Sequence, residues 1–144
     1  MPTEPGALVD RLEIAETLCR YASAVDARDY DVLRTVFADD VEATYGEHAP
    51  MHGVDEVVDW IARYGRQQAW QHHLVSVYRV SVDGDAATAL TYVTASQAAS
   101  ADPEVVSTTH GRYDDSLRRF EGVWRITQRR MDVVRRVSRS ISRA

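Results

Sequence analysis

The sequence contains neither lysine nor asparagine, and all 17 of its basic residues are arginine. Schiff-base chemistry and Walker-type phosphate loops both need a lysine, so neither is open to this chain. A glycine-rich G-x-G-x-x-G stretch is also missing, which argues against a nucleotide cofactor. We therefore expect a protein that works without a cofactor.

Cysteine and long apolar runs are scarce as well. The single cysteine, Cys19, excludes a disulfide within the chain, and its place beside Leu18 predicts a small buried hydrophobic side chain. No run reaches the length of about 18 apolar residues that a membrane span requires. Residues 1–10 lack the basic start and the apolar block of a signal peptide. We expect a cytoplasmic protein with no membrane partner.

The charge balance argues against nucleic acid as a partner. The formal net charge is −5 at pH 7, whereas nucleic-acid-binding domains present a concentrated basic surface. Arginines gather only near the C-terminus, at Arg135, Arg136, Arg139 and Arg143, among serines. We expect one domain over residues 1–137 and a solvated, partly disordered basic tail over residues 138–144.

A carboxylate interrupts the apolar stripe of the first predicted helix. Counting back from Asp26, apolar residues recur at helical spacings, namely Ala22, Leu18, Ala15, Leu12 and Leu8. A carboxylate that ends such a stripe is a candidate for acid or base chemistry. The alternative is that Asp26 lies past the helix end and only caps the turn.

Apolar periodicity predicts helices first and strands afterwards. The helices cover residues 6–25, 30–37 and 54–68, and Asp29 is the expected N-cap of the second. The strands cover residues 41–45, 72–82, 86–97, 105–118 and 123–137, with a hairpin signal at Asp83-Gly84-Asp85. This order predicts an α+β fold, in which a curved antiparallel sheet forms a cone with three helices packed on its concave side.

The strand over residues 72–82 carries apolar side chains on both of its faces. Leu74 and Tyr78 alternate with Val75 and Val77. If the helices cover one face, the other needs a partner of its own. We therefore expect a homo-oligomer, a dimer or a trimer, that packs through the sheet.

The histidines and the last arginines supply the candidate polar groups of a cavity. His72 and His73 are adjacent in a strand, so one of them faces the cavity and the other faces away. Arg129 and Arg130 present the same choice, which a β-bulge would reverse. A metal site is not expected, because Pro50 separates His48 from His52 and no cysteine or carboxylate motif completes a ligand set.

Taken together, several short motifs resemble the SnoaL-like branch of the nuclear transport factor 2-like superfamily over residues 8–130. The motifs are Tyr21-x-x-x-Val25-Asp26-Ala27-Arg28-Asp29-Tyr30, Phe37-Ala38-Asp39-Asp40-Val41, Gly53, His72-His73, Asp83-Gly84-Asp85-Ala86, Gly111-x-Tyr113 and Gly122-Val123-Trp124-Arg125-Ile126. This family includes scytalone dehydratase, bile acid 7α-dehydratase, hexachlorocyclohexane dehydrochlorinase and polyketide cyclases. Dioxygenase β subunits share its cone fold without an active site of their own.

The resemblance implies roles for individual residues. Asp26 matches the aspartate of an Asp–His dyad, His73 matches its base, and Arg129 matches an arginine beside the leaving group. Tyr21 matches a tyrosine of bile acid dehydratase-like members, where the dehydrochlorinase has a lysine, so dehalogenation is disfavoured. Three further residues are expected to contact the substrate, namely His110, Tyr45 and Trp60.

The function implied by the resemblance is that of a cofactor-free lyase or isomerase, most simply a dehydratase. Its substrate would be a small apolar compound that carries a carbonyl group, of polyketide, steroid or aromatic type. Elimination, isomerisation and cyclisation differ in where the proton goes, and the sequence leaves that choice open. The alternative is a non-catalytic protein that binds a ligand or serves as a scaffold, as a dioxygenase β subunit does.

Overall fold

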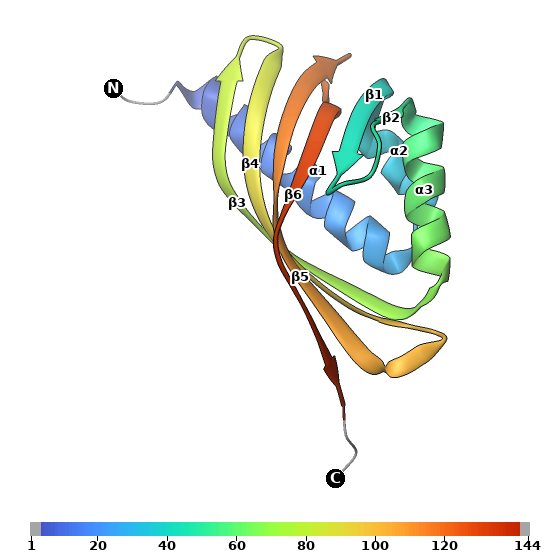
Figure 1. The fold of residues 1–144 in the computed structure, drawn as a ribbon. Helices are drawn as coiled ribbons and strands as arrows, with labels where there is room; N and C mark the ends of the chain where they lie inside the picture. Colours follow the sequence, from blue (N-terminus) through green and yellow to red (C-terminus); the bar gives the residue numbers. More distant parts are fainter. Residues whose placement is uncertain (1–3, 142–144) are drawn as a thin grey trace.

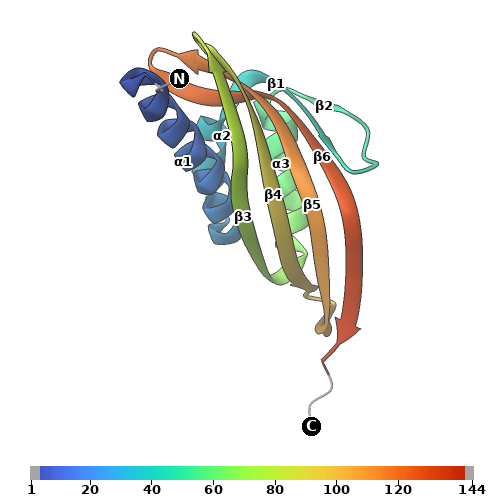
Figure 2. The ribbon, with the colours of Figure 1, turned by 90° about the vertical axis from the view of Figure 1, so that its left-hand side faces the viewer.

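Three helices lie on one side of a curved six-stranded sheet in the computed structural model, which describes residues 4–141 (Figure 1, Figure 2). The helices are α1 (Pro5–Ala27), α2 (Tyr30–Val36) and α3 (Val54–Arg66). The strands are β1 (Phe37–Tyr45), β2 (Met51–His52), β3 (Gln68–Asp83), β4 (Ala86–Ala99), β5 (Asp102–Phe120) and β6 (Val123–Ser140). The predicted α+β class and cone are confirmed. No helix in this range combines the length and apolar character needed to cross a membrane.

The sheet has the strand order β2-β1-β6-β5-β4-β3. Tight turns join β3 through β6, so these strands are antiparallel, as predicted. β1 differs, because it runs parallel to β6 with Ala43 opposite Arg129. No hairpin connects these two strands, so the chain is free to bring them together in either direction.

The predicted cap of α2 and the predicted hairpin turn are present in the structure, and the last strand is longer than predicted. Asp29 caps α2, as expected, because its side chain accepts a hydrogen bond from the backbone N–H of Val32 at 3.1 Å. The hairpin turn between β3 and β4 contains Gly84, whose φ of +59° lies in the left-handed region that favours glycine. β6 continues to Ser140, so residues 138–140 belong to the sheet rather than to the expected tail. Arg143 lies outside the described residues.

The buried stripe of α1 differs from the predicted one. It begins at Ile14 and is centred on Leu18, Tyr21 and Val25, which the helical repeat places on one face. The same repeat turns Leu12 to the opposite side, so the prediction was wrong for Leu8 and Leu12, which are 54% and 64% exposed. Cys19 is also exposed, contrary to its predicted burial.

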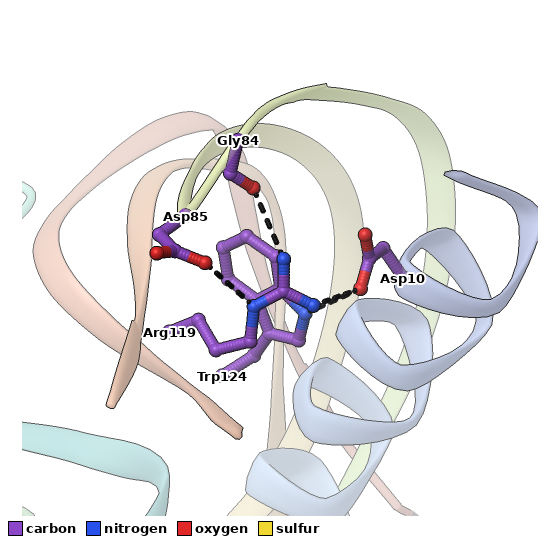
Figure 3. Close-up of polar contacts among 5 residues, drawn as sticks. All are labelled: Asp10, Gly84, Asp85, Arg119 and Trp124. Atoms are coloured by element: carbon purple, nitrogen blue, oxygen red, sulfur yellow. Dashed lines mark hydrogen bonds and ion pairs between the residues drawn. The ribbon is translucent and has the colours of Figure 1, made fainter. Parts of the chain in front are cut away.

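Arg119 anchors the first turns of α1 to one end of the sheet (Figure 3). Its guanidinium lies 4.9 Å from the ring centroid of Trp124 and donates to Asp10 at 2.6 Å, to Asp85 at 2.9 Å and to the carbonyl of Gly84 at 3.3 Å. The indole N–H of Trp124 donates to the same Asp10 oxygen at 3.3 Å. These contacts join α1 to the β3–β4 turn, at a distance along the helix from the residues that line the cavity.

A β-bulge in β6 decides which of its two adjacent arginines, Arg129 or Arg130, faces the helices. Leu117 pairs with Ile126 and Ser116 with Gln128, so Thr127 is an extra residue. The alternation after this bulge places Arg129 on the inner face, where it is 3% exposed, and Arg130 on the outer face. The choice between the two arginines that the sequence left open is therefore decided by the bulge.

Candidate active site

A cavity of about 690 Å³ lies between the inner face of the sheet and the helices α1 and α3. Aromatic side chains form much of its wall, and they come from α1, β1, α3 and β5: Tyr21, Tyr45, Trp60, Tyr64 and Tyr113. The ring of Trp60 lies 4.8 Å from that of Tyr45 and 6.2 Å from that of Tyr64. Tyr45 and Trp60 thus lie where a bound molecule would contact them.

His73 and Asp26 form a hydrogen-bonded pair at this cavity. One carboxylate oxygen of Asp26 lies 2.7 Å from Nδ1 of His73, and the other accepts from the backbone N–H of His73 at 2.8 Å. The side chain of His73 is 12% exposed and that of Asp26 is 23% exposed. Because a carboxylate only accepts hydrogen bonds, the proton of the neutral imidazole lies on Nδ1 and Nε2 carries the lone pair. The geometry is that of a histidine base oriented by a carboxylate.

Hydrogen bonds hold the end of α1 against the start of β3. Gln71 donates to the carbonyl of Val25 at 2.8 Å, and Arg28 donates to the carbonyl of Gln68 at 2.7 Å. α1 ends at Ala27, and its C-cap Arg28 adopts a left-handed conformation, so Asp26 lies within the helix and does not cap the turn. These contacts fix the position of Asp26 relative to His73.

The parity of β3 decides between the two adjacent histidines. His73 shares the inner face with Val75 and Val77, whereas His72 shares the outer face with Leu74 and is exposed. Only His73 lines the cavity and contacts Asp26. The position of His73 agrees with the sequence prediction.

Tyr21 and Tyr45 place their hydroxyl groups side by side in the cavity wall, with 3.0 Å between the two oxygens. Both side chains are buried, and burial raises the pKa of each above its ordinary value, although the charge of Arg129 opposes the shift. The two hydroxyls therefore stay protonated at neutral pH. One of the two hydroxyls donates a hydrogen bond to the other.

Arg129 lies behind these tyrosines rather than in the cavity lining. Its Nε and Nη2 donate to the two oxygens of Asp115, both at 2.8 Å, and its guanidinium carbon lies 4.1 Å and 4.0 Å from the ring centroids of Tyr21 and Tyr113. Burial alone would lower the pKa of Arg129, but the charge of Asp115 and its hydrogen bonds outweigh burial and raise it. Arg129 thus contacts the tyrosines that line the cavity, and a bound molecule would meet those tyrosines first.

His110 does not belong to this site. It is exposed on the outer face of β5, where Thr94 lies 3.3 Å from its Nδ1, and it lines a small depression with Arg135. The expectation that His110 contacts the substrate is therefore not supported by its position. Strict alternation explains the placement, because Thr109, Gly111 and Tyr113 face inward.

The sequence reasoning missed two buried residues of the site, Tyr113 and Asp115. They alternate with outward-facing residues and precede Leu117 on the inner face of β5. An aspartate in such an apolar row requires a cation, by the same argument that singled out Asp26. The alternation of Asp115 with outward-facing residues was therefore enough to predict an inward-facing arginine on a neighbouring strand.

A curved sheet that holds a His–Asp pair and buried tyrosines around one cavity places the chain among the small α+β proteins of the cone fold, whose helices close over a pocket. The sequence profile of the SnoaL-like domain matches residues 6–130. The chain belongs to the SnoaL-like domain family, within the nuclear transport factor 2-like superfamily.

Relatives and solved structures agree with this assignment. The uncharacterized protein Rv2910c of Mycobacterium tuberculosis H37Rv is 30% identical over 124 residues, which span 83% of this chain and 82% of that protein. A type 2 hexachlorocyclohexane dehydrochlorinase (LinA) superposes with a TM-score of 0.85 at 16% identity, over 95% of this chain and 93% of the other. A protein of Novosphingobium aromaticivorans, provisionally named a scytalone dehydratase, superposes with a TM-score of 0.83 at 19% identity, over 95% and 96% of the two chains. At these identities the two solved structures demonstrate a shared fold.

Proposed function

We propose that this protein is a cofactor-free lyase or isomerase, most simply a dehydratase, that acts on a small apolar compound with a carbonyl group. The observation that carries the proposal is the Asp26–His73 pair, with its 2.7 Å hydrogen bond, at the wall of an aromatic cavity. Two proteins of the same fold, a dehydrochlorinase and one provisionally named a dehydratase, bear names of elimination reactions. Their names support the same class of chemistry for this chain.

The proposed reaction begins with His73 as the general base. Nε2 takes a proton from the carbon next to the carbonyl group, and Asp26 stabilises the imidazolium that forms. A hydroxyl group of the Tyr21–Tyr45 pair donates a hydrogen bond to the oxygen on which negative charge develops. The imidazolium then returns its proton to the departing hydroxide, so that one water leaves and one carbon–carbon double bond forms.

Arg129 has a supporting role in this proposal. It lies within 4.1 Å of the ring centroids of Tyr21 and Tyr113, and Asp115 holds it there through two hydrogen bonds. Its positive charge favours negative charge on the nearby hydroxyl groups, which makes them stronger donors to a developing oxyanion. Arg129 is thus a positioning residue that acts through the tyrosines.

The proposal is tested by the turnover of a panel of bicyclic β-hydroxy ketones, followed by the ultraviolet absorbance of the conjugated ketone product. We expect His73→Ala and Asp26→Asn each to lower kcat by about a hundred- to ten-thousand-fold. The double variant should be little worse than either single variant, because the two residues act as one unit. His72→Ala is the matched control and should keep wild-type activity, since His72 faces away from the cavity.

The outcomes separate the enzyme from the scaffold. Wild-type rates in His73→Ala or Asp26→Asn would rule out the dyad. A wild-type protein that binds these ketones without converting them would favour the alternative, a ligand-binding or dioxygenase β-like scaffold protein. A homo-oligomeric state and a cytoplasmic location stay predictions from the sequence, as does the absence of a cofactor.

A further inference from the structure

A second bulge on β6 turns an arginine towards the cavity. Gly111 pairs with Val133 and His110 with Arg135, so Val134 is an extra residue in the strand. After this bulge Arg136 pairs with Thr109 and lines the cavity. Without this bulge, the alternation that continues from Arg129 would have turned Arg135 inward instead. Bulges near functional sites commonly re-aim a side chain in this way.

Arg136 and His73 belong to the same row of inward-facing residues across the sheet. His73 pairs with Ala95 on β4, Ala95 pairs with Thr109 on β5, and Thr109 pairs with Arg136 on β6. Adjacent strands are about 4.8 Å apart, so three spacings separate the backbones of His73 and Arg136 by about 14 Å. The base and the arginine therefore line opposite sides of one cavity, and one elongated molecule can contact both.

The guanidinium of Arg136 is oriented but not neutralised. Its Nε donates to the hydroxyl of Thr109 at 3.1 Å, and Thr109 is itself only 4% exposed. Among residues 4–141 no carboxylate lies within ion-pair distance of Arg136. Two acidic residues also line the cavity, but Asp132 accepts a hydrogen bond from Arg130 at 3.1 Å, and Glu47 is exposed in the loop before β2. The two terminal nitrogens of Arg136 thus remain free to bind a ligand.

Further donors lie at the same end of the cavity. Gln97 hydrogen-bonds the hydroxyl of Tyr64, and both side chains line the cavity with Arg136. Burial raises the pKa of Tyr64, and the positive charge of Arg136 opposes that shift. An anion bound here would meet one full positive charge together with neutral hydroxyl and amide groups.

We propose that Arg136 is a specificity-determining residue that binds a carboxylate at the end of the substrate remote from the reacting carbon. The planar fork of a guanidinium matches the two oxygens of a carboxylate, and Thr109 already holds that fork in one orientation. The aromatic wall formed by Tyr45, Trp60 and Tyr64 accommodates the planar apolar part between the two ends. This inference rests on the proposed function, because it assigns both ends of the cavity to the molecule whose proton His73 removes.

Equilibrium binding of a matched ligand pair tests the inference without any turnover. Isothermal titration calorimetry compares 2-naphthoate, a planar aromatic carboxylate, with 2-naphthamide, its neutral analogue. We expect the wild-type protein to bind the carboxylate about tenfold more tightly than the amide, and Arg136→Gln to remove that preference while amide binding stays the same. Because no chemistry is measured, a failure of the His73–Asp26 mechanism leaves this result unaffected.

Arg135→Gln is the matched control. It removes the same charge from the next residue, which faces away from the cavity, and should keep the carboxylate preference. Thr109→Val removes only the hydroxyl that orients Arg136 and should reduce the preference by several-fold. It serves in place of Arg136→Gln if that variant does not fold. The inference is overturned if the wild-type protein shows no preference for 2-naphthoate, if Arg136→Gln keeps the preference, or if Arg135→Gln loses it equally.

Discussion

Replacement of Asp115 by asparagine removes the carboxylate that neutralises the buried Arg129. The pair is almost fully enclosed, since the side chains of Arg129 and Asp115 are 1% and 0% exposed, and both hydrogen bonds between them are 2.8 Å long. An amide of the same shape can accept only one of these bonds and carries no charge. Asp115→Asn therefore leaves an uncompensated positive charge inside the protein.

The burial of this ion pair determines how much Asp115→Asn is expected to lower the free energy of unfolding. Loss of one partner of a buried ion pair destabilises a protein by about 3–5 kcal/mol, against a total stability of about 5–15 kcal/mol for a domain. For a chain of this length, that loss lowers Tm by about 10–15 °C. The Asp115→Leu/Arg129→Met double variant removes both charges and should recover most of the loss, because an apolar pair of similar volume can replace a buried ion pair.

Urea unfolding, followed by circular dichroism, measures these differences against a control from the adjacent residue. Asp114 lies on the outer face, where its side chain is 50% exposed and one carboxylate oxygen is 3.4 Å from Arg130. Asp114→Asn should therefore cost no more than about 1 kcal/mol. A stability of Asp115→Asn within about 1 kcal/mol of the wild type, or equal to that of Asp114→Asn, would refute the assignment of a buried, uncompensated charge.

Two further predictions concern the tyrosines of the site and the outer face of the sheet. Burial raises the folded-state pKa of Tyr21 and Tyr45 above that of the unfolded chain, so their contribution to stability is complete below about pH 10 and is lost as the pH rises further. Urea unfolding at about pH 8 and pH 11 should show this loss, and an equal loss in the Tyr21→Phe/Tyr45→Phe variant would contradict it. If the chain assembles through the outer face, where Tyr78 is 66% exposed and stacks on Tyr92 at 4.3 Å, light scattering should give the mass of a dimer or trimer for the wild type and of a monomer for Tyr78→Glu. A monomeric wild type at micromolar concentration would rule out that assembly.

Local patterns in the sequence were enough to predict the architecture. The helical and strand periods, the cap at Asp29 and the turn at Asp83-Gly84-Asp85 each depend on residues that are close together in the chain. Asp26 was recognisable for a similar reason, since a carboxylate at the edge of an apolar stripe conflicts with its surroundings unless a partner is present. The resemblance to the SnoaL-like family then related Asp26 to His73 across 47 residues.

The face of the sheet on which each side chain of the long strands lies could be determined only from the tertiary structure. Strict alternation from Trp124 predicts that Arg130 faces inward, but the bulge at Thr127 shifts the parity by one residue and brings Arg129 inward instead. The bulge at Val134 shifts the parity back, so that Arg136 rather than Arg135 lines the cavity. A bulge depends on how two strands pair, and no residue type in β6 marks it.

Partnerships between distant side chains were likewise decided by packing. The packing of α1 against β1 places the hydroxyls of Tyr21 and Tyr45 3.0 Å apart. The pairing of β5 with β6 brings Asp115 within hydrogen-bond distance of Arg129. The parallel pairing of β1 with β6 also belongs to this level, since no turn connects the two strands. The sequence by itself therefore determined the fold class and the presence of a histidine–aspartate pair. The tertiary structure decided which charged groups meet in the cavity, because pairing register and burial depend on contacts between residues far apart in the chain.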